Sequence, residues 1–156
     1  MNVIFIFGAK YLYFLVFIIA GIYFLKQPRE IQKKIFMFSV ISIPFIYLLA
    51  TIAGCLYLNP RPFVVGNFTP LIPHIPDNGF PSDHVLMVSA VASIIMYFNR
   101  RTGIILWLLT ILIAISRVYV GVHHPIDVIG SIIISLIVTF SVYTLTKYAT
   151  HKKVSK

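Results

Sequence analysis

Long apolar stretches separated by short polar connections dominate this sequence of 156 residues. Hydrophobic residues make up 59% of the chain and only four residues are acidic, which excludes an ordinary soluble domain. A helix needs roughly 17–25 apolar residues to cross a bilayer. Five stretches are candidates, although the third needs Pro81–Asp83 as its entry: Val3–Leu25, Ile35–Leu58, His84–Phe98, Gly103–Val120 and Pro125–Tyr148. We therefore predict an all-α polytopic membrane bundle of about five transmembrane helices, forming a single integral membrane domain over residues 1–156.

The positive charges predict how this bundle is oriented. In a five-helix arrangement, ten basic residues fall on one side: Lys26, Arg29, Lys33, Lys34, Arg100, Arg101, Lys147, Lys152, Lys153 and Lys156. The positive-inside rule makes that side cytoplasmic and the N-terminus external. No basic region precedes the first apolar stretch, so we expect an uncleaved helix in the cytoplasmic membrane. The net charge of +9 lies mostly between apolar segments, which argues against a nucleic-acid partner.

The connection Asn59–Pro81, on the outer side, is rich in proline. It holds six of the nine prolines, interleaved with apolar residues such as Phe63, Phe68 and Ile72. Proline forbids a long regular helix, and the apolar residues favour the headgroup boundary over water. We expect a lid or lipid-entry loop lying on the membrane, and a passive connector packed on the helix ends is the alternative.

Two arginines lie outside the cytoplasmic segments. Arg61 and Arg117 both stand at the ends of apolar stretches, where a guanidinium group is costly and usually has a functional partner. A guanidinium group can hold two phosphate oxygens in fixed geometry. We expect the two to form a cationic cradle for a phosphoryl group.

The run Pro81–His84 has the form of a helix start. Ser82 is the predicted N-cap, and the free N–H groups of a first helical turn form a natural phosphate site. We assign Ser82 and Asp83 to phosphate binding and expect His84, in the first turn, to face the bound anion.

A second helix start follows at Pro125, which suits the first helical position. His124 is then the N-cap, and Asp127 lies in the first turn, where it can reach back to His123. A carboxylate that holds one imidazole nitrogen leaves the other free as a nucleophile. We interpret His123 as the reactive histidine and His124 as a structural or rim residue.

A metal site built from these histidines and Asp127 is the competing interpretation, since both are common ligand types. However, two arginines already supply positive charge, and no His-Glu-x-x-His motif is present. We therefore expect neither a metal nor another cofactor. Cys55 lies in an apolar run and is expected to be structural.

Three runs resemble the motifs of the type-2 phosphatidic acid phosphatase superfamily, whose pattern is Lys-x6-Arg-Pro, Pro-Ser-Gly-His and Ser-Arg-x5-His-x3-Asp. Here they are Arg61-Pro62, Pro81–His84, and Ser116-Arg117 followed by His123 and Asp127. The resemblance implies a metal-independent enzyme with His123 as nucleophile and Asp127 as its orienting group. It also implies His84 as general acid, and phosphate ligands at Arg61, Ser82 and Arg117.

Two departures from the pattern concern the phosphate site. Asp83 replaces the usual glycine, a variant similar to bacterial undecaprenyl pyrophosphate phosphatases. Gly54 stands where the family has lysine, so one phosphate cation is missing. Lys10 is expected in the outer part of the first helix, and we hypothesise that it replaces this cation, with snorkelling to lipid headgroups as the alternative.

These features favour a lipid phosphatase at the outer face of the cytoplasmic membrane. The resemblance implies a substrate such as undecaprenyl pyrophosphate, phosphatidylglycerol phosphate or lipid A 1-phosphate. A non-catalytic protein that binds or transports lipid phosphates is the rival, supported by Gly54. A structural subunit would explain the glycines but not the arginines and histidines.

Overall fold

The structure is a computed structural model that describes the backbone of residues 2–154 and the side chains of residues 2–148. It is a bundle of five long helices and one short one: α1 (Asn2–Leu25), α2 (Arg29–Leu56), α3 (Pro62–Val65), α4 (Asp83–Phe98), α5 (Arg100–Tyr119) and α6 (Pro125–Val154). The predicted all-α polytopic bundle is therefore confirmed. Four of the helices, α1, α2, α5 and α6, are long and apolar enough to cross a membrane. The sequence did not predict α3.

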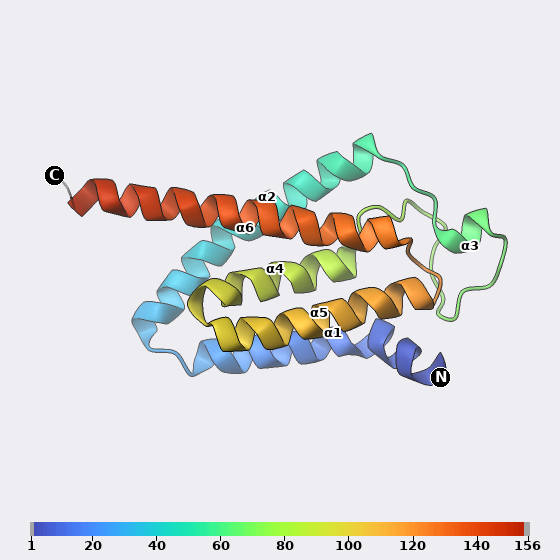
Figure 1. Cartoon of the computed structure of the whole chain (residues 1–156), viewed down its shortest axis with the longest axis horizontal. Helices are drawn as coiled ribbons and strands as arrows, with labels where there is room; N and C mark the ends of the chain where they lie inside the picture. The colour runs from blue at the N-terminus through green and yellow to red at the C-terminus, as the bar shows by residue number, and fades with distance from the viewer. Residues whose placement is uncertain (1, 155–156) are drawn as a thin grey trace.

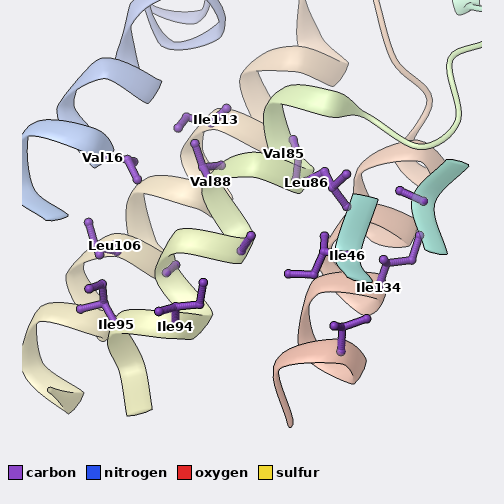
Figure 2. Packing of buried hydrophobic residues seen from close by; sticks show 14 of the residues in the cluster. Val16, Ile46, Val85, Leu86, Val88, Ile94, Ile95, Leu106, Ile113 and Ile134 are labelled. Atoms are coloured by element: carbon purple, nitrogen blue, oxygen red, sulfur yellow. The ribbon is translucent and has the colours of Figure 1, made fainter. Parts of the chain in front are cut away.

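The shortest of the long helices, α4, occupies the centre of the bundle (Figure 1). Nine of its 16 residues are buried, and it packs against α1, α2, α5 and α6. Figure 2 shows Val85, Leu86 and Val88 of α4 between residues of the surrounding helices, including Val16 and Ile46. The outer faces of those helices keep large apolar side chains exposed, as expected of surfaces that meet lipid.

Serine side chains join α4 to α6. The Ser89 hydroxyl donates to Ser135 Oγ at 2.8 Å, and the Ser131 hydroxyl donates to the Ser82 carbonyl at 2.9 Å. In an apolar surrounding such bonds contribute about 0.6–2 kcal/mol each. They hold the beginning of α4 against the first turns of α6, where the sequence placed two of its three motifs.

The residues at the starts of α4 and α6 are those predicted, but one predicted capping hydrogen bond is not formed. Pro125 is the first residue of α6, and Ser82 is the N-cap residue of α4, both as predicted. The Ser82 side chain, however, makes no capping hydrogen bond. Asn99 caps α5 instead by accepting a hydrogen bond from the Thr102 amide at 2.9 Å.

The two ends of the bundle differ in their chemistry (Figure 1). The α1–α2 connection, the α4–α5 connection and the C-terminal end of α6 lie at one end, which carries those residues of the predicted cytoplasmic set that fall within the described backbone. The N-terminus, α3, the long connection before α4 and the α5–α6 connection lie at the other end. All three motifs are thus gathered at one end of the bundle. Lys156 lies outside the described residues.

Close contact between α4 and α5 makes a first prediction possible. A Cβ added at Gly103 would lie 2.5 Å from the Met96 backbone, whereas one added at Gly21 would meet nothing within 4 Å. Helix propensity alone favours alanine over glycine by about 1 kcal/mol at both positions. We expect Gly103→Ala to lower the free energy of unfolding by about 1–3 kcal/mol, because overpacking separates the helices.

The matched variant Gly21→Ala should leave stability unchanged or raise it. Thermal unfolding of both purified variants in detergent measures the difference. Equal thermal unfolding midpoints for the two variants would contradict the close contact between Gly103 and the Met96 backbone.

Candidate active site

The imidazole of His123 is at the centre of the motif cluster. It lies in the connection between α5 and α6 and is only 2% exposed. Its Nδ1 is 3.0 Å from the carbonyl oxygen of Gly79 and 3.4 Å from Asp127 Oδ2. Because a carbonyl oxygen can only accept, Nδ1 carries the hydrogen of the neutral ring. Nε2 is therefore left with its lone pair.

Both arginines of the predicted cradle converge on this second nitrogen. Arg61 Nη1 lies 3.3 Å from His123 Nε2, and Arg117 Nη2 lies 3.3 Å from the same atom. Arg61 is further held by a hydrogen bond from Nη1 to the Val122 carbonyl at 2.9 Å, and by an ion pair from Nε to Asp77 at 2.5 Å. Two fixed cations thus surround the one unprotonated nitrogen of His123.

The electrostatic surroundings keep His123 neutral. Burial, together with the charges of Arg117 and Arg61, lowers the pKa of His123 below its ordinary value, although the hydrogen bond with Asp127 acts in the opposite direction. A lowered pKa means that the ring stays unprotonated near neutral pH and is protonated only in more acidic solution. The neutral form is the one that can act as a nucleophile.

Asp127 is completely buried and held by several donors. Its Oδ1 accepts from Asn59 Nδ2 at 2.7 Å, and its Oδ2 accepts from the His124 backbone amide at 2.7 Å. The second bond is the one in which, in a capping box, the side chain of the third helical residue accepts from the backbone amide of the N-cap residue. The carboxylate faces His123 as predicted, but the Gly79 carbonyl is the nearer partner of Nδ1. The sequence did not predict this second orienting group.

Gly79 has to be glycine because the backbone comes so close to the carboxylate. A Cβ at this position would lie 2.9 Å from Asp127 Oδ2 and 3.1 Å from the Asn59 carbonyl oxygen. Oδ2 accepts from the His124 amide and the Asn59 carbonyl oxygen accepts from the Gly79 amide, so displacing either atom disturbs a hydrogen bond of the site.

Two donors that face this cluster lack partners. Among the described residues, Ser82 Oγ and Arg117 Nε are buried without a hydrogen bond. Buried polar groups are almost always paired, so each such atom needs an explanation. Tetrahedral oxygens next to His123 would supply an acceptor for both. This observation supports, without testing, the assignment of Ser82 and Arg117 to phosphate binding.

His84 lies near the cluster but outside its hydrogen bonds. It is partly buried at the start of α4, and its ring packs edge-on against Tyr13 of α1 with centroids 5.4 Å apart. His84 lies close enough to Arg117 and His123 to interact with them electrostatically. Its position is compatible with the predicted proton donor, which stays a prediction.

Two predicted phosphate ligands are not brought into the cluster. Lys10 is exposed on α1 beside the exposed Phe7 and Phe14, and within the described part of the chain it forms no hydrogen bond or ion pair. Its exposure favours snorkelling to lipid headgroups, the alternative given above, and the hypothesis that it replaces the family lysine stays a prediction. Asp83 is also exposed, although its carboxylate lies within electrostatic reach of Arg117. Its assignment to phosphate binding stays a prediction.

The long connection before α4 contributes more to the site than a lid or passive connector would. Besides Gly79, it brings Asn59, His74 and Asp77 to the motif residues, with His74 Nε2 only 3.0 Å from Arg117 Nη2. Sequence reasoning missed all four. Their polarity within an otherwise apolar connection was the available signal.

Asn78 gives this connection its shape. Its side chain accepts from the backbone amides of Asn59 and Phe80, and its Nδ2 donates to the carbonyl oxygens of Gly54 and Phe80 at 2.9 and 3.0 Å. A Cβ added at Gly54 would lie 3.0 Å from the Phe80 carbonyl oxygen. The position of the family lysine is therefore packed against the turn that leads into α4.

A cleft of about 400 Å³ opens beside His123. It is lined by α3, the connection that follows it and the end of α5, with Phe68 and Leu71 among its apolar walls. An apolar groove of similar size, between the outer halves of α5 and α6, shares Val118, Tyr119 and Pro125 with this cleft. An apolar groove thus adjoins the cleft that opens beside the buried imidazole.

Comparison with known proteins agrees with this geometry. The model of the PAP2 superfamily matches residues 33–151, which include every motif described above. The chain belongs to this superfamily. The resemblance predicted from the three motifs is confirmed, and the four helices long and apolar enough to cross a membrane agree with a multi-pass membrane protein.

Individual relatives match parts of the chain. Undecaprenyl-diphosphatase BcrC of Bacillus subtilis (strain 168) is 40% identical over 84 residues, which are 54% of this chain and 44% of that protein. The bacitracin transport permease protein BcrC of Bacillus licheniformis is 28% identical over 144 residues, 92% of this chain and 70% of that protein. The chain thus spans less than half the length of the first relative.

A solved structure has the same fold. Aquifex aeolicus LpxE superposes with a TM-score of 0.74 at 23% identity, over 92% of this chain and 85% of that chain. At this identity the likeness establishes the arrangement of the helices and not the substrate.

Proposed function

We propose that this superfamily member removes the terminal phosphate of a membrane lipid phosphate or diphosphate through a phosphohistidine on His123. One observation carries the proposal: Nε2 of His123 is the unprotonated nitrogen, and it lies 3.3 Å from a guanidinium nitrogen of both Arg61 and Arg117. A nucleophile between two fixed cations is the arrangement that transfer of an anionic phosphoryl group requires.

In the first step, Nε2 attacks phosphorus, and the bond from phosphorus to the lipid oxygen breaks. The arginines neutralise the charge on the equatorial oxygens, and Ser82 Oγ and Arg117 Nε, both buried without partners, gain acceptors. The imidazole becomes cationic, which the buried Asp127 carboxylate and the Gly79 carbonyl stabilise at Nδ1. His84 gives a proton to the departing lipid oxygen.

In the second step, water attacks the phosphohistidine. His84, now unprotonated, takes the proton of the attacking water, the bond from phosphorus to Nε2 breaks, and inorganic phosphate leaves. The protein then returns to its starting state with His123 neutral. No oxidant, reductant or cofactor enters either step.

A lipid substrate is supported by the apolar surface beside the site. The groove between α5 and α6 is lined almost entirely by aliphatic side chains and shares Val118, Tyr119 and Pro125 with the cleft beside His123. An acyl or prenyl chain lying in it would bring its headgroup to the arginines. Relatives that bear the name undecaprenyl-diphosphatase favour a prenyl diphosphate as the substrate.

We place the site at the outer face of the cytoplasmic membrane. The basic residues of the two short connections between helices lie at the opposite end of the bundle, and the positive-inside rule makes that end cytoplasmic. Labelling of single cysteines introduced at each end, with a reagent that does not cross membranes, tests this orientation.

Phosphate release from a panel of detergent-solubilised lipids tests the function. The panel contains undecaprenyl diphosphate, phosphatidylglycerol phosphate and lipid A 1-phosphate, each with and without a chelator. We expect release to survive the chelator, because arginines supply the positive charge, and to be blocked by vanadate, which adopts the geometry of the transferring phosphorus. Activity that disappears in chelator and returns with a divalent ion would refute metal independence.

A protein that binds or transports lipid phosphates without hydrolysing them is the second candidate. It is favoured by the absence of the family lysine at Gly54 and by the name of the Bacillus licheniformis relative, bacitracin transport permease protein BcrC. The same panel separates the two functions. Saturable lipid binding without phosphate release from any member would establish the second candidate and reject the first.

A further inference from the structure

His74 is a histidine of the connection between α3 and α4 that belongs to none of the three sequence motifs. Its Nε2 lies 3.0 Å from Arg117 Nη2, and its ring centroid lies 6.1 Å from that of His123. Its other nitrogen, Nδ1, is buried and has no hydrogen-bond partner of good geometry among the described residues. An imidazole therefore contacts the same guanidinium group that faces the nucleophilic nitrogen.

The backbone holds His74 firmly in this position. Pro73 precedes it and Pro76 follows two residues later, so the torsion angles of the segment are restricted. Ile72 is 3% exposed and packs in a small cluster with Val120, while the Leu71 amide donates to the Val120 carbonyl at 3.0 Å. Such anchoring is what a side chain that must meet a ligand in fixed geometry needs.

The site lacks a third positive group of the usual kind. Position 54 is glycine and packs against the Phe80 carbonyl oxygen, and the Lys10 side chain is exposed on the surface of α1. Within the described part of the chain, Arg61 and Arg117 are the two cations beside His123. Apart from His84, which the proposed mechanism uses as proton donor, and the nucleophile His123, His74 is a side chain next to them that is able to acquire a positive charge.

We propose that His74 is a further substrate-binding residue, which takes up a proton when the anion enters and donates a hydrogen bond from Nε2 to a phosphoryl oxygen. This rests on the function proposed above and supplies the third positive group of its phosphate site. In the free protein Arg117 is the donor, so Nε2 of His74 must be unprotonated. Once a phosphoryl oxygen accepts from Arg117, that nitrogen is free to bind a proton from solvent.

The charges around His74 decide the direction of this change. Arg117 of α5, Arg61 before α3, His123 before α6 and Asp77 in the same connection all lie within electrostatic reach, as does His84 of α4. Burial, reinforced by the charges of Arg61 and Arg117, lowers the pKa of His74 in the free protein.

A bound dianion opposes the two guanidinium charges and so raises the pKa of His74. Proton uptake then accompanies binding. The contribution of His74 to affinity is complete below its pKa in the free protein and is lost as pH rises through its pKa in the complex.

Competition by sulfate tests this directly. Sulfate is a tetrahedral dianion that does not itself titrate between about pH 5 and 8, so any pH dependence of its inhibition constant belongs to the protein. In the wild type we expect sulfate affinity to fall as pH rises. In His74→Gln the slope of sulfate affinity against pH should become shallower, by as much as about a factor of ten in affinity per pH unit, which corresponds to the uptake of one proton. His74→Lys should bind sulfate tightly, and the contribution of residue 74 to sulfate affinity should not fall with pH across the same range.

His124→Gln is the matched control, because His124 is a neighbouring histidine whose ring contacts the Pro60 carbonyl. His124→Gln should keep the wild-type pH dependence of sulfate affinity. If replacing any histidine near the site altered this dependence through a structural change, His124→Gln would alter it as well. An unchanged dependence in His74→Gln would overturn the proposal.

A measurement on the wild type alone covers the case in which the variants fail to fold. Calorimetric titration of sulfate in two buffers of different ionisation enthalpy reports the protons taken up on binding, and the absence of uptake would overturn the proposal. The function itself is judged separately, by phosphate release from lipids. If the wild type releases none but His74 still controls sulfate affinity, the proposed hydrolysis fails and the anion-binding role of His74 stands.

Discussion

Replacing His123 with alanine is expected to abolish phosphate release. The side chain supplies the unprotonated nitrogen that faces both arginines, and without it there is no atom to receive the phosphoryl group. Loss of a covalent nucleophile typically lowers turnover by a factor of a thousand or more, about 4 kcal/mol of transition-state stabilisation. Phosphate release and trapping of an acid-labile phosphoenzyme from labelled substrate both measure it.

The neighbouring His124 provides the control for this prediction. Its ring contacts the Pro60 carbonyl at 3.2 Å, while its part in binding Asp127 is made by the backbone amide and survives replacement by alanine. His124→Ala should therefore retain most of the activity and form the labelled intermediate. Comparable losses in the two variants would show that the nucleophile has been assigned to the wrong histidine.

Replacing Arg61 with lysine is expected to reduce kcat/KM by about a hundredfold, or about 2.7 kcal/mol, although the charge is preserved. Arg61 pairs through Nε with Asp77 and donates through Nη1 to the Val122 carbonyl, with Nη1 also beside His123. A single ammonium group cannot occupy these separated positions at once. The comparison requires steady-state kinetics alongside thermal unfolding.

Arg101→Lys is the matched variant, since Arg101 is exposed at the opposite end of the bundle. It should have wild-type kinetics and stability. An Arg61→Lys enzyme with full activity would show that positive charge alone suffices, and that the forked geometry of the guanidinium group is not needed.

The helices were predictable because their signals are local. Apolar length indicates a membrane-spanning helix whatever the rest of the chain does, and all five expected helices exist with ends shifted by a few residues. Proline at the first position of α6 and serine before α4 mark helix starts through backbone chemistry within one turn. The spacing of His123 and Asp127 along the first turn of α6 likewise brings them together without tertiary information.

The central position of α4 was not predictable in the same way. It is the shortest of the five long helices, with 16 residues, and only packing against α1, α2, α5 and α6 makes it the core of the bundle. The exposed position of the Lys10 side chain was not predictable for a related reason. Depth along a helix follows from sequence position, whereas the face that a side chain occupies depends on where the neighbouring helices lie.

By itself, the sequence determined the helices, the end of the bundle that carries the site, and the motif residues Arg61, Ser82, Arg117, His123 and Asp127. Only the tertiary structure decided which groups join them. Asn59 meets Asp127 across 68 positions of sequence, and His74 meets Arg117 across 43. The connection that carries both has no helical or strand periodicity to reveal which side chains turn inward. Its proline-restricted path becomes defined only when it folds back over the ends of the helices, because the hydrogen bonds that fix it are made to groups distant in sequence.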